Sequence, residues 1–438
     1  MKKLNVTMKV FSKLLGKAAW SSLRLATVLI VALLLGSAAR ADAVLDWNAI
    51  AIDTAIANGQ SPYAQARFAA ITQLAVFEAV NAVKGDYKPY LGSIVAPRGA
   101  SADAAAVAAG YRVLRTYFPA SAMSLDAALA NSLALIPDGQ AKDDGIATGE
   151  AAASAMILLR ANDGSSPPQF YTPGPALPGA YQATPSCPVV NGIAVGAFFH
   201  WQNVTPFGIH SAQDFLLEPP PALNSSRYAK SYNETKTVGS LTSTARPPDR
   251  ADVVHYYAIS SPSQVFNQAA RQVAAAQGGS LSENARALAL INMAISDSLV
   301  ASFFNKYHYN FWRPETAIRA GDTDGNWRTV VDPSFLPFIA TPCFPSYPSN
   351  HGSGSGGGAE VLRRLYGEDG HSITLSNPAV PSITLQYTTF EEITDDISDA
   401  RVFGGIHFRF DQVAGARLGR AVGASVYKNN LRHVDESE

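Results

Sequence analysis

Two cations lie among aromatic residues in the segment KYHYNFWRPETAIR at residues 306–319. Lys306 and Arg313 are seven positions apart, close to two helical turns, so both can point the same way if the helix continues toward Pro314. The aromatic neighbours indicate partial burial, where an unpaired charge is costly. The pair therefore favours a bound oxyanion over a solvated basic face.

A second segment, CFPSYPSNHGSGSGGG at residues 343–358, holds one histidine between prolines and glycines. Ser349 or Asn350 can cap the helix that follows, whose first-turn amides would face an anion. The glycines permit close backbone approach, and His351 stands at the mouth of the amide cluster. A lone histidine in such a loop is more often structural, so this segment does not indicate an anion site without the other two segments.

The third segment is ARVFGGIHFRFDQ at residues 400–412. Arg401 supplies a planar guanidinium that suits a tetrahedral oxyanion. His407 and Asp411 are four positions apart and can share one helical face, where the carboxylate fixes the tautomer of the imidazole and raises its basicity. This pairing serves either a metal-binding or a nucleophilic histidine.

The remaining histidines lack a comparable partner spacing, and we expect them to be structural or exposed. They are His200, His210, His255, His308, His371 and His433. His308 stays a weak candidate because it lies between Lys306 and Arg313. Asp297 lies nine positions before Lys306, so it could pair with a cation of the site or be exposed.

The elements that must position these residues are predicted to be helices. Apolar residues recur at helical spacing, and Ser280 with Glu283 forms a possible capping box. The expected helices span 62–83, 261–277, 281–306, 353–366, 390–403 and 407–428. Residues 164–250 are rich in proline, serine and asparagine, and we expect them to wrap over the helices. Because no strand alternation is evident, the sequence predicts an all-α protein with long irregular connecting loops.

Residues 1–41 have the composition of a signal peptide. They carry seven Lys or Arg and no acid, an apolar run at 25–36 and small residues at 39–41 for cleavage near Ala41. An uncleaved anchor is the alternative. We expect an exported protein, periplasmic or secreted, with no membrane span in the mature chain. Export would also permit a disulfide between Cys187 and Cys343, the two cysteines.

Net charge argues against nucleic acid as a partner. Removal of the seven N-terminal cations changes the formal net charge of −1 to −8. An acidic protein is a poor ligand for a phosphate backbone.

Taken together, the three segments resemble the signature of the vanadium-dependent haloperoxidases and the type 2 phosphatidic acid phosphatase superfamily. That signature reads KxxxxxxRP, PSGH and SRxxxxxHxxxD in this order, and the resemblance covers residues 281–431. FPSYPSNH and ARVFGGIHFRFD look like the vanadium chloroperoxidase branch and its exported bacterial relatives. Two positions depart from the pattern: Asn350 replaces a glycine but keeps its backbone N–H, and Ala400 replaces a serine.

The resemblance implies a fold of two four-helix bundles in one compact unit, with the oxyanion site in the C-terminal one. We place a signal peptide at 1–41, an N-terminal helical region with Pro-rich wrapping loops at 42–260, and the C-terminal helical bundle at 261–438.

The resemblance also implies a role for each matching residue. His407 would bond the vanadium of vanadate, His351 would be the acid/base residue, and Asp411 would support His407. Phe344 falls at a position that suggests a halide pocket. The residues that would bind the oxygens of the oxyanion are Lys306, Arg313, Ser349, Asn350 and Arg401.

Two reactions fit these roles. A haloperoxidase would use hydrogen peroxide to oxidise a halide to a hypohalous-acid equivalent. Because phosphate can occupy the same site, an exported acid phosphatase would instead hydrolyse a phosphate monoester through a phosphohistidine. A catalytically degenerate oxyanion-binding protein is a third reading, although an acid/base His351 argues against it. The large chain and the Phe-rich surroundings favour the haloperoxidase.

Overall fold

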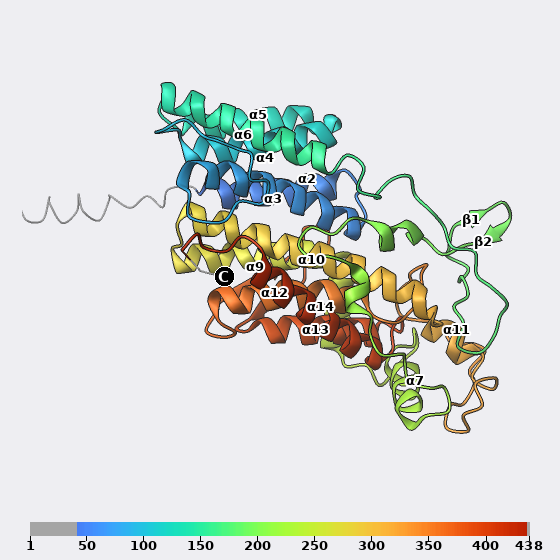
Figure 1. The fold of residues 1–438 in the computed structure, drawn as a ribbon. Coiled ribbons are helices and arrows are strands. Elements are labelled where there is room, and N and C mark those ends of the chain that lie inside the picture. Colours follow the sequence, from blue (N-terminus) through green and yellow to red (C-terminus); the bar gives the residue numbers. More distant parts are fainter. Residues whose placement is uncertain (1–41, 436–438) are drawn as a thin grey trace, which may run out of the picture. The chain divides into compact units, whose positions relative to one another are not determined.

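The computed structural model describes residues 42–435, and the signal peptide predicted for residues 1–41 lies outside them. The described residues form 13 α-helices, short 3₁₀ helices and two small antiparallel hairpins (Figure 1). The all-α prediction is therefore confirmed. The helices are α2 (Ala43–Ala57), α3 (Pro62–Lys84), α4 (Ala102–Tyr117), α5 (Ala122–Ala134), α6 (Gln140–Leu159), α7 (Ser226–Val238), α8 (Pro248–Ile259), α9 (Pro262–Gln277), α10 (Leu281–Tyr309), α11 (Pro314–Arg319), α12 (Asn350–Tyr366), α13 (Phe390–Phe403) and α14 (Arg409–Asn429).

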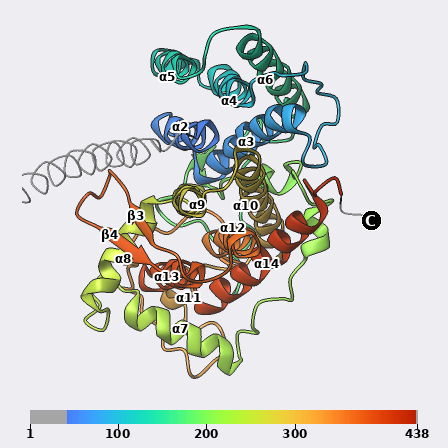
Figure 2. The same ribbon diagram turned by 90° about the vertical axis from the view of Figure 1, so that its left-hand side faces the viewer.

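Two groups of helices make up the compact unit that begins at Ala43. In the first group α2, α3, α4 and α6 pack on one another and α5 covers α4. In the second, α10, α12 and α14 pack together, with α9 and α13 against α12 (Figure 2). Helix α10 also packs on α3, which joins the two groups.

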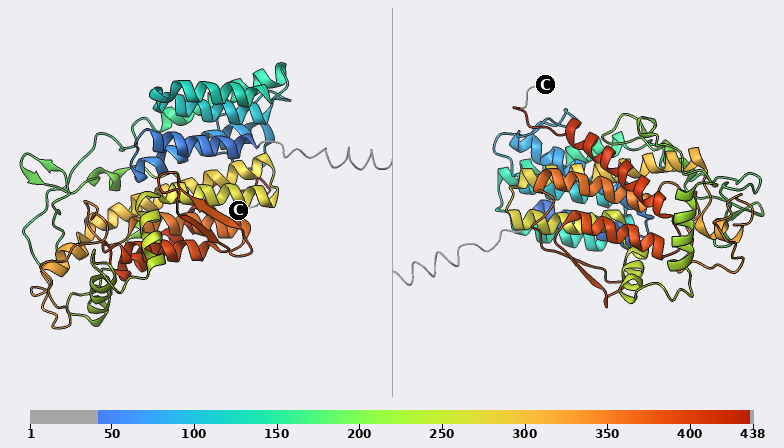
Figure 3. Two further views of the ribbon diagram at one scale, coloured as in Figure 1. Left: turned by 180° about the vertical axis from the view of Figure 1, so that it is seen from behind. Right: turned by 90° about the horizontal axis from the view of Figure 1, so that it is seen from below.

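The hairpins lie in the connecting segments. Strands β1 (Val189–Val190) and β2 (Ile193–Ala194) form one, and β3 (Ile373–Ser376) and β4 (Thr384–Tyr387) the other. The long connection between α6 and α7 runs along the outside of the helices, as Figure 3 shows, and buries Tyr181, Trp201 and Phe207. Cys187 in this connection forms a disulfide with Cys343, which answers whether the two cysteines pair.

Helix α10 begins at the predicted capping box. The hydroxyl of Ser280 accepts from the amide of Glu283, and the Glu283 carboxylate accepts from the amide of Ser280. The helix ends at Asn310, whose φ of 47° is left-handed. The spacing predicted that Lys306 and Arg313 could share one helix, but they do not, because α10 ends between them. Arg313 is extended because it precedes Pro314, and the turn between the helices brings the two cations together.

The glycine-rich run of α12 permits close packing of helices. A Cβ at Gly356 would lie 2.7 Å from the carbonyl oxygen of Ala416, and one at Gly415 would lie 2.5 Å from that of Ser349. Glycine therefore serves here mainly to bring α12 and α14 together, and this contact fixes the start of α12 beside the start of α14.

Two helices among the described residues are long and apolar enough to cross a membrane by length and composition. They are α3 and α10, and 83% and 94% of their most apolar windows are buried inside the protein. Packing between the two helical groups accounts for their apolar surfaces.

Candidate active site

The three sequence motifs meet at one end of the second helical group. Lys306 lies in the last turn of α10, Arg401 in the last turn of α13, and Ser349 caps α12. His407 immediately precedes α14, and Asp411 lies in its first turn. The histidine and the carboxylate are thus held at a helix start and do not share one face of a continuous helix.

Lys306 is completely buried, and its ammonium group is surrounded by the proline-rich loop. Its Nζ donates to the carbonyl oxygens of Pro345 and Ser346, each at 2.9 Å, and to that of Pro348. Burial, with the nearby charge of Arg313, holds the pKa of Lys306 well below its usual value. The loop therefore places a cation where solvent cannot stabilise it.

The two arginines are also buried, and each keeps an unused donor. Arg313 donates from Nε to Phe344 O at 2.7 Å and from Nη1 to Ile406 O at 2.9 Å, whereas its Nη2 has no hydrogen-bond partner in residues 42–435. Arg401 donates from Nη1 to Tyr257 O at 3.2 Å, and its Nε has no partner in the same range. Burial lowers the pKa of both guanidinium groups to about 10.

His407 is oriented from both sides of its ring. Its Nδ1 lies 2.9 Å from Oδ2 of Asp411, which also accepts from the hydroxyl of Ser346 at 2.6 Å and the amide of Phe408 at 3.0 Å. Its Nε2 faces Nη1 of Arg313 at 3.0 Å. Because a guanidinium can only donate, the proton of the neutral imidazole belongs on Nδ1 and the lone pair on Nε2.

Burial and the surrounding cations hold the pKa of His407 well below its usual value, with Arg313 and Lys306 the largest charge effects. The ring is therefore neutral near pH 7. A neutral imidazole with Nε2 unprotonated can bond a metal centre or attack an electrophile.

His351, half-buried in the first turn of α12, faces the same cations. Burial, followed by the charge of Arg401, lowers its pKa strongly, and a hydrogen bond to the Ser260 backbone opposes this shift. Since that carbonyl takes one ring N–H, the other ring nitrogen of the neutral form is an acceptor.

Ser349 and Asn350 begin α12 beside the cations. The Ser349 hydroxyl accepts from the amide of Gly352 at 3.2 Å, so its own proton is available to another acceptor. The Asn350 side chain accepts from Ser302 Oγ at 2.7 Å, while its Nδ2 has no hydrogen-bond partner among the described residues.

Sequence reasoning missed Tyr63, which reaches the site from the first turn of α3. Burial raises its pKa to about 12, against the opposing effects of the Asn350 side chain, Arg313 and Arg401. Its ring packs edge-on against Phe303 with centroids 4.7 Å apart. No spacing in the chain links Tyr63 to the motifs, because it belongs to the other helical group.

Phe344 forms an aromatic wall of the site. Its ring centroid lies 5.2 Å from Nζ of Lys306 and 4.9 Å from Cζ of Arg313. The ring also packs edge-on against Phe303 at 5.4 Å. Phe344 thus packs beside two of the buried cations, and its role in a halide pocket stays a prediction.

Asp297 does not pair with a cation of the site and is not exposed. It is fully buried and accepts from the amides of Phe207, Gly208 and Ile209 at 2.7, 2.6 and 3.1 Å. Its carboxylate therefore holds the connection between α6 and α7 against α10.

The other histidines lie outside the group of cations and donors that we call the cage, which consists of Lys306, Arg313, Ser349, Asn350 and Arg401. His200 and His371 are buried, and each has a backbone hydrogen-bond partner, Gln169 N at 3.0 Å and Gly367 O at 3.1 Å. His210, His255, His308 and His433 are exposed.

The donors of this cage fit a tetrahedral oxyanion. None of Lys306, Arg313 and Arg401 forms an ion pair with a carboxylate in the described part of the chain. A buried charge without a partner is costly, and so is a buried donor without an acceptor. Arg313 Nη2, Arg401 Nε and Asn350 Nδ2 are such donors. An anion that accepts from several sides would satisfy both requirements.

The same residues fall within a region that matches known proteins. Residues 286–436 match the family model of the VCPO second helical-bundle domain. The chain is also 26% identical over 233 residues to the vanadium chloroperoxidase of Curvularia inaequalis. Residues 286–436 are thus similar to the second helical bundle of the vanadium chloroperoxidases. The resemblance that the three motifs predicted is thereby confirmed, and every predicted site residue lies inside the matched bundle.

The match to the vanadium chloroperoxidase covers 46% of this chain and 37% of that relative, so the chain spans little more than a third of its length. Two solved structures share the fold over most of the chain. A bacterial vanadium-dependent iodoperoxidase has a TM-score of 0.74 at 23% identity, covering 91% of this chain and 97% of its own. An apo-type bacterial vanadium-dependent chloroperoxidase has a TM-score of 0.67 at 17% identity, covering 82% and 92%.

Proposed function

We propose that this protein is a vanadium-dependent haloperoxidase, which uses hydrogen peroxide to oxidise a halide to a hypohalous-acid equivalent. One observation carries the proposal: three buried cations without a carboxylate ion pair in residues 42–435 surround an unprotonated Nε2 of His407. Vanadate bonded to that nitrogen would supply a Lewis acid that activates peroxide toward a halide, without haem or flavin.

The cations and donors of the cage would hold the oxygens of vanadate. Lys306, Arg313 and Arg401 would neutralise its negative charge, and the two orphaned arginine nitrogens would each gain an acceptor. The Ser349 hydroxyl and the Asn350 backbone N–H would add hydrogen bonds. Backbone contacts fix Lys306 and Arg401, which would need little rearrangement on binding, whereas Nη1 of Arg313 would have to leave Nε2 of His407.

The two histidines would have different roles: His407 would bond vanadium, and His351 would transfer protons. Asp411 holds the Nδ1 proton of His407, so the lone pair on Nε2 stays directed into the cage. His351 is neutral near pH 7, and its free ring nitrogen would accept a proton from hydrogen peroxide. The imidazolium would then return this proton to a leaving oxygen. Phe344 would border the halide pocket beside two of the cations.

A phosphatase is the second candidate, and the orientation of His407 favours it equally. Nε2 carries the lone pair that a nucleophile needs, and the cations would stabilise the charge that develops on a transferred phosphoryl group. In this reaction His351 would protonate the leaving alcohol. The names of the relatives, vanadium-dependent chloroperoxidases and an iodoperoxidase, weigh toward the haloperoxidase.

One experiment separates the two reactions. Purified protein is loaded with orthovanadate and assayed for peroxide-dependent bromination of a reporter, and the metal-free protein for hydrolysis of p-nitrophenyl phosphate. Bromination that requires vanadate, disappears in His407→Ala and persists in the exposed control His210→Ala supports the proposal. Phosphate hydrolysis that vanadate inhibits, without bromination, would overturn it in favour of the phosphatase.

We also propose that the protein is exported, with residues 1–41 removed as a signal peptide. The Cys187–Cys343 disulfide supports this compartment, because disulfides persist mainly under oxidising conditions. N-terminal sequencing of the protein recovered from the periplasm or medium would test it. A mature N-terminus at Asp42 is expected, and full-length protein retained with the membrane would argue for an uncleaved anchor.

A further inference from the structure

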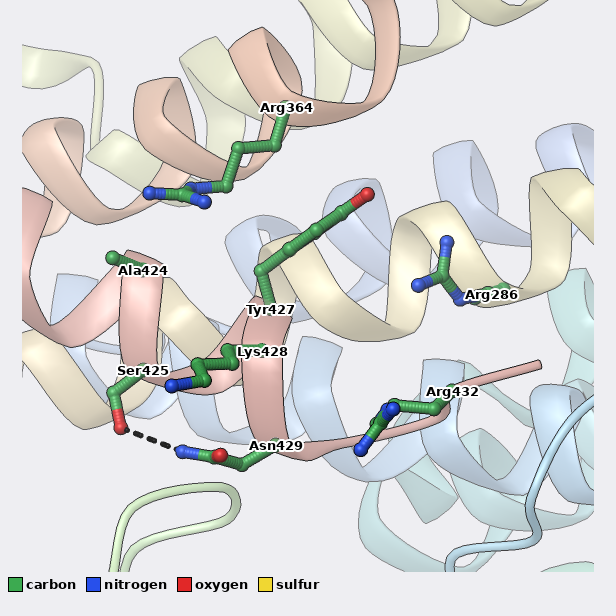
Figure 4. A pocket seen from close by; sticks show the side chains of 8 residues that line it. All are labelled: Arg286, Arg364, Ala424, Ser425, Tyr427, Lys428, Asn429 and Arg432. Carbon is green, nitrogen blue, oxygen red and sulfur yellow. Dashed lines mark hydrogen bonds between the residues drawn. The ribbon is translucent and has the colours of Figure 1, made fainter. Parts of the chain in front are cut away.

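A basic pocket of about 640 Å³ opens at the far ends of the helices that carry the candidate active site (Figure 4). Its walls come from the first turns of α10, the last turn of α12, the last turns of α14 and the segment that follows α14. No Asp or Glu lies among the described residues that line it. The charged lining residues are four cations: Arg286, Arg364, Lys428 and Arg432.

This pocket is separate from the oxyanion cage. Arg286 and Lys306 are both on α10 and are twenty positions apart. At 1.5 Å per residue, that spacing places them about 30 Å from each other along the helix. An anion bound in the basic pocket therefore cannot touch the residues of the candidate active site.

Helix ends account for only some of the positive charge. Arg364 and Lys428 lie in the last turns of α12 and α14, where a cation is stabilised by the partial negative charge of the helix end. Arg364 also pairs with Glu360, its Nε lying 2.7 Å from Oε1. These two cations would have a structural explanation even if the pocket bound nothing.

Arg286 has no such explanation for its charge. It is the sixth residue of α10, far from the C-terminal turn where the helix dipole favours a cation, and only 8% of its surface is exposed. Its Nε donates to Leu431 O at 2.7 Å, and its guanidinium lies 5.2 and 5.4 Å from the ring centroids of Tyr87 and Tyr427. It has no carboxylate ion pair within residues 42–435.

The contacts of Arg286 leave its terminal nitrogens for a ligand. The bond to Leu431 uses Nε alone, and Figure 4 shows the guanidinium directed toward Tyr427 inside the pocket. Lys428 likewise has no ion pair with a described carboxylate, and its side chain is exposed. Arg286 and Lys428 thus carry two positive charges that no described carboxylate pairs, although the mature protein is predicted to be acidic overall.

We propose that this pocket binds the phosphate or sulfate group of a small molecule. Arginine forks and a lysine suit a doubly charged tetrahedral oxyanion. The volume, about 640 Å³, exceeds what one oxyanion needs and is typical of a small-molecule site. The ring of Tyr427 and the side chain of Asn429 border the remaining space and would contact the rest of the ligand.

Calorimetric titration of the full chain tests the proposal, with inorganic phosphate and glycerol 2-phosphate as separate probes. Each titration is repeated on Arg401→Ala, which disables the cage, and in that background on Lys428→Glu and Arg364→Glu in the pocket and on the exposed control Lys230→Glu on α7. We expect binding that survives in Arg401→Ala and Lys230→Glu and weakens roughly tenfold or more in each pocket variant, since each loses a charge-assisted hydrogen bond.

The two probes distinguish the source of the oxyanion. Equal affinity would mean that the free ion is recognised, and tighter binding of the ester would mean that the groups around Tyr427 contribute. Arg286→Gln is a further variant, but because Arg286 also holds Leu431 its folding is checked by circular dichroism. Binding that the two pocket variants leave unchanged, or that Arg401→Ala abolishes completely, would overturn the proposal without affecting the proposed haloperoxidase.

Discussion

Nη1 of Arg313 lies 3.0 Å from Nε2 of His407 and points a proton at its lone pair. Arg313 therefore occupies the direction in which a ligand of His407 would lie, and it marks Nε2 as unprotonated. Asp411 completes this orientation from the opposite side of the ring, 2.9 Å from Nδ1. The reactivity of Nε2 of His407 thus depends on the carboxylate of Asp411, which lies on the opposite side of the ring.

Asp411→Asn is expected to weaken vanadate binding although the cationic side chains of the cage stay in place. His407, Ser346 and Phe408 all bond Oδ2 of Asp411, so an amide oxygen could take its place but without the negative charge, and the Nδ1 proton would be held less firmly. Loss of such a supporting partner typically costs 10–100-fold in metal affinity. The measurement is bromination rate against vanadate concentration, with the exposed Asp138→Asn as control. Equal half-saturation in all three proteins would contradict the supporting role of Asp411.

Oxyanion binding is expected to stabilise the fold. The unliganded cage holds Lys306, Arg313 and Arg401 without a carboxylate ion pair in the described residues, so an anion that binds only the folded state adds stability. At a ligand concentration of 100 times Kd this amounts to about 2.7 kcal/mol. Urea unfolding with and without orthovanadate measures it, and Arg401→Ala should lose most of the gain. A wild-type midpoint that does not move with vanadate would count against an oxyanion site.

Two buried carboxyls should respond to pH with opposite signs. Burial raises the pKa of Asp297 to about 6, whereas Arg67 and Arg160 hold that of Asp163 below its usual value despite burial. Because its folded-state pKa is raised, Asp297 favours folding most when protonated, and this contribution is lost as pH rises through about 6. Asp163 contributes above its unfolded pKa, and its contribution is lost as pH falls.

Unfolding free energies of Asp297→Asn and Asp163→Asn at pH 4 to 7 test this difference. Relative to Asp297→Asn, the wild type should lose about 2 to 3 kcal/mol as pH rises from 4 to 7. Relative to Asp163→Asn it should change little over this interval and lose stability when the measurement is extended below about pH 4. Parallel curves for the two variants would show that these carboxyls do not titrate as their surroundings indicate.

The sequence predicted which residues lie together better than the way in which they are positioned. Motif spacing placed Lys306, Arg313 and His407 in one site, but the first two were expected on one helix and the structure separates them by a turn at Asn310. Spacing along a chain reports local geometry, whereas the cage is closed by contacts between distant segments. For the same reason, no local pattern pointed to Tyr63, and Asp297 was misread because its partners are amides of a connecting loop.

Tyr63 and Asn350 offer a test of whether the first helical group contributes to the site. Asn350 stands where the family pattern has glycine, and its side chain is held by Ser302 and lies near Tyr63 of α3. Asn350→Gly would keep the backbone N–H, so we expect vanadate affinity within a few-fold of wild type. The loss of the hydrogen bond to Ser302 should lower stability by about 1 kcal/mol.

Tyr63→Phe removes only a hydroxyl and keeps the aromatic packing against Phe303. If the phenol contributes a hydrogen bond to the bound oxyanion, vanadate affinity should fall roughly 2- to 10-fold, the usual worth of one neutral hydrogen bond. Vanadate titration of bromination in the single variants and in Tyr63→Phe/Asn350→Gly measures both effects and their coupling. Tyr63→Phe with unchanged affinity and turnover would confine the site to the C-terminal bundle and leave Tyr63 a packing residue.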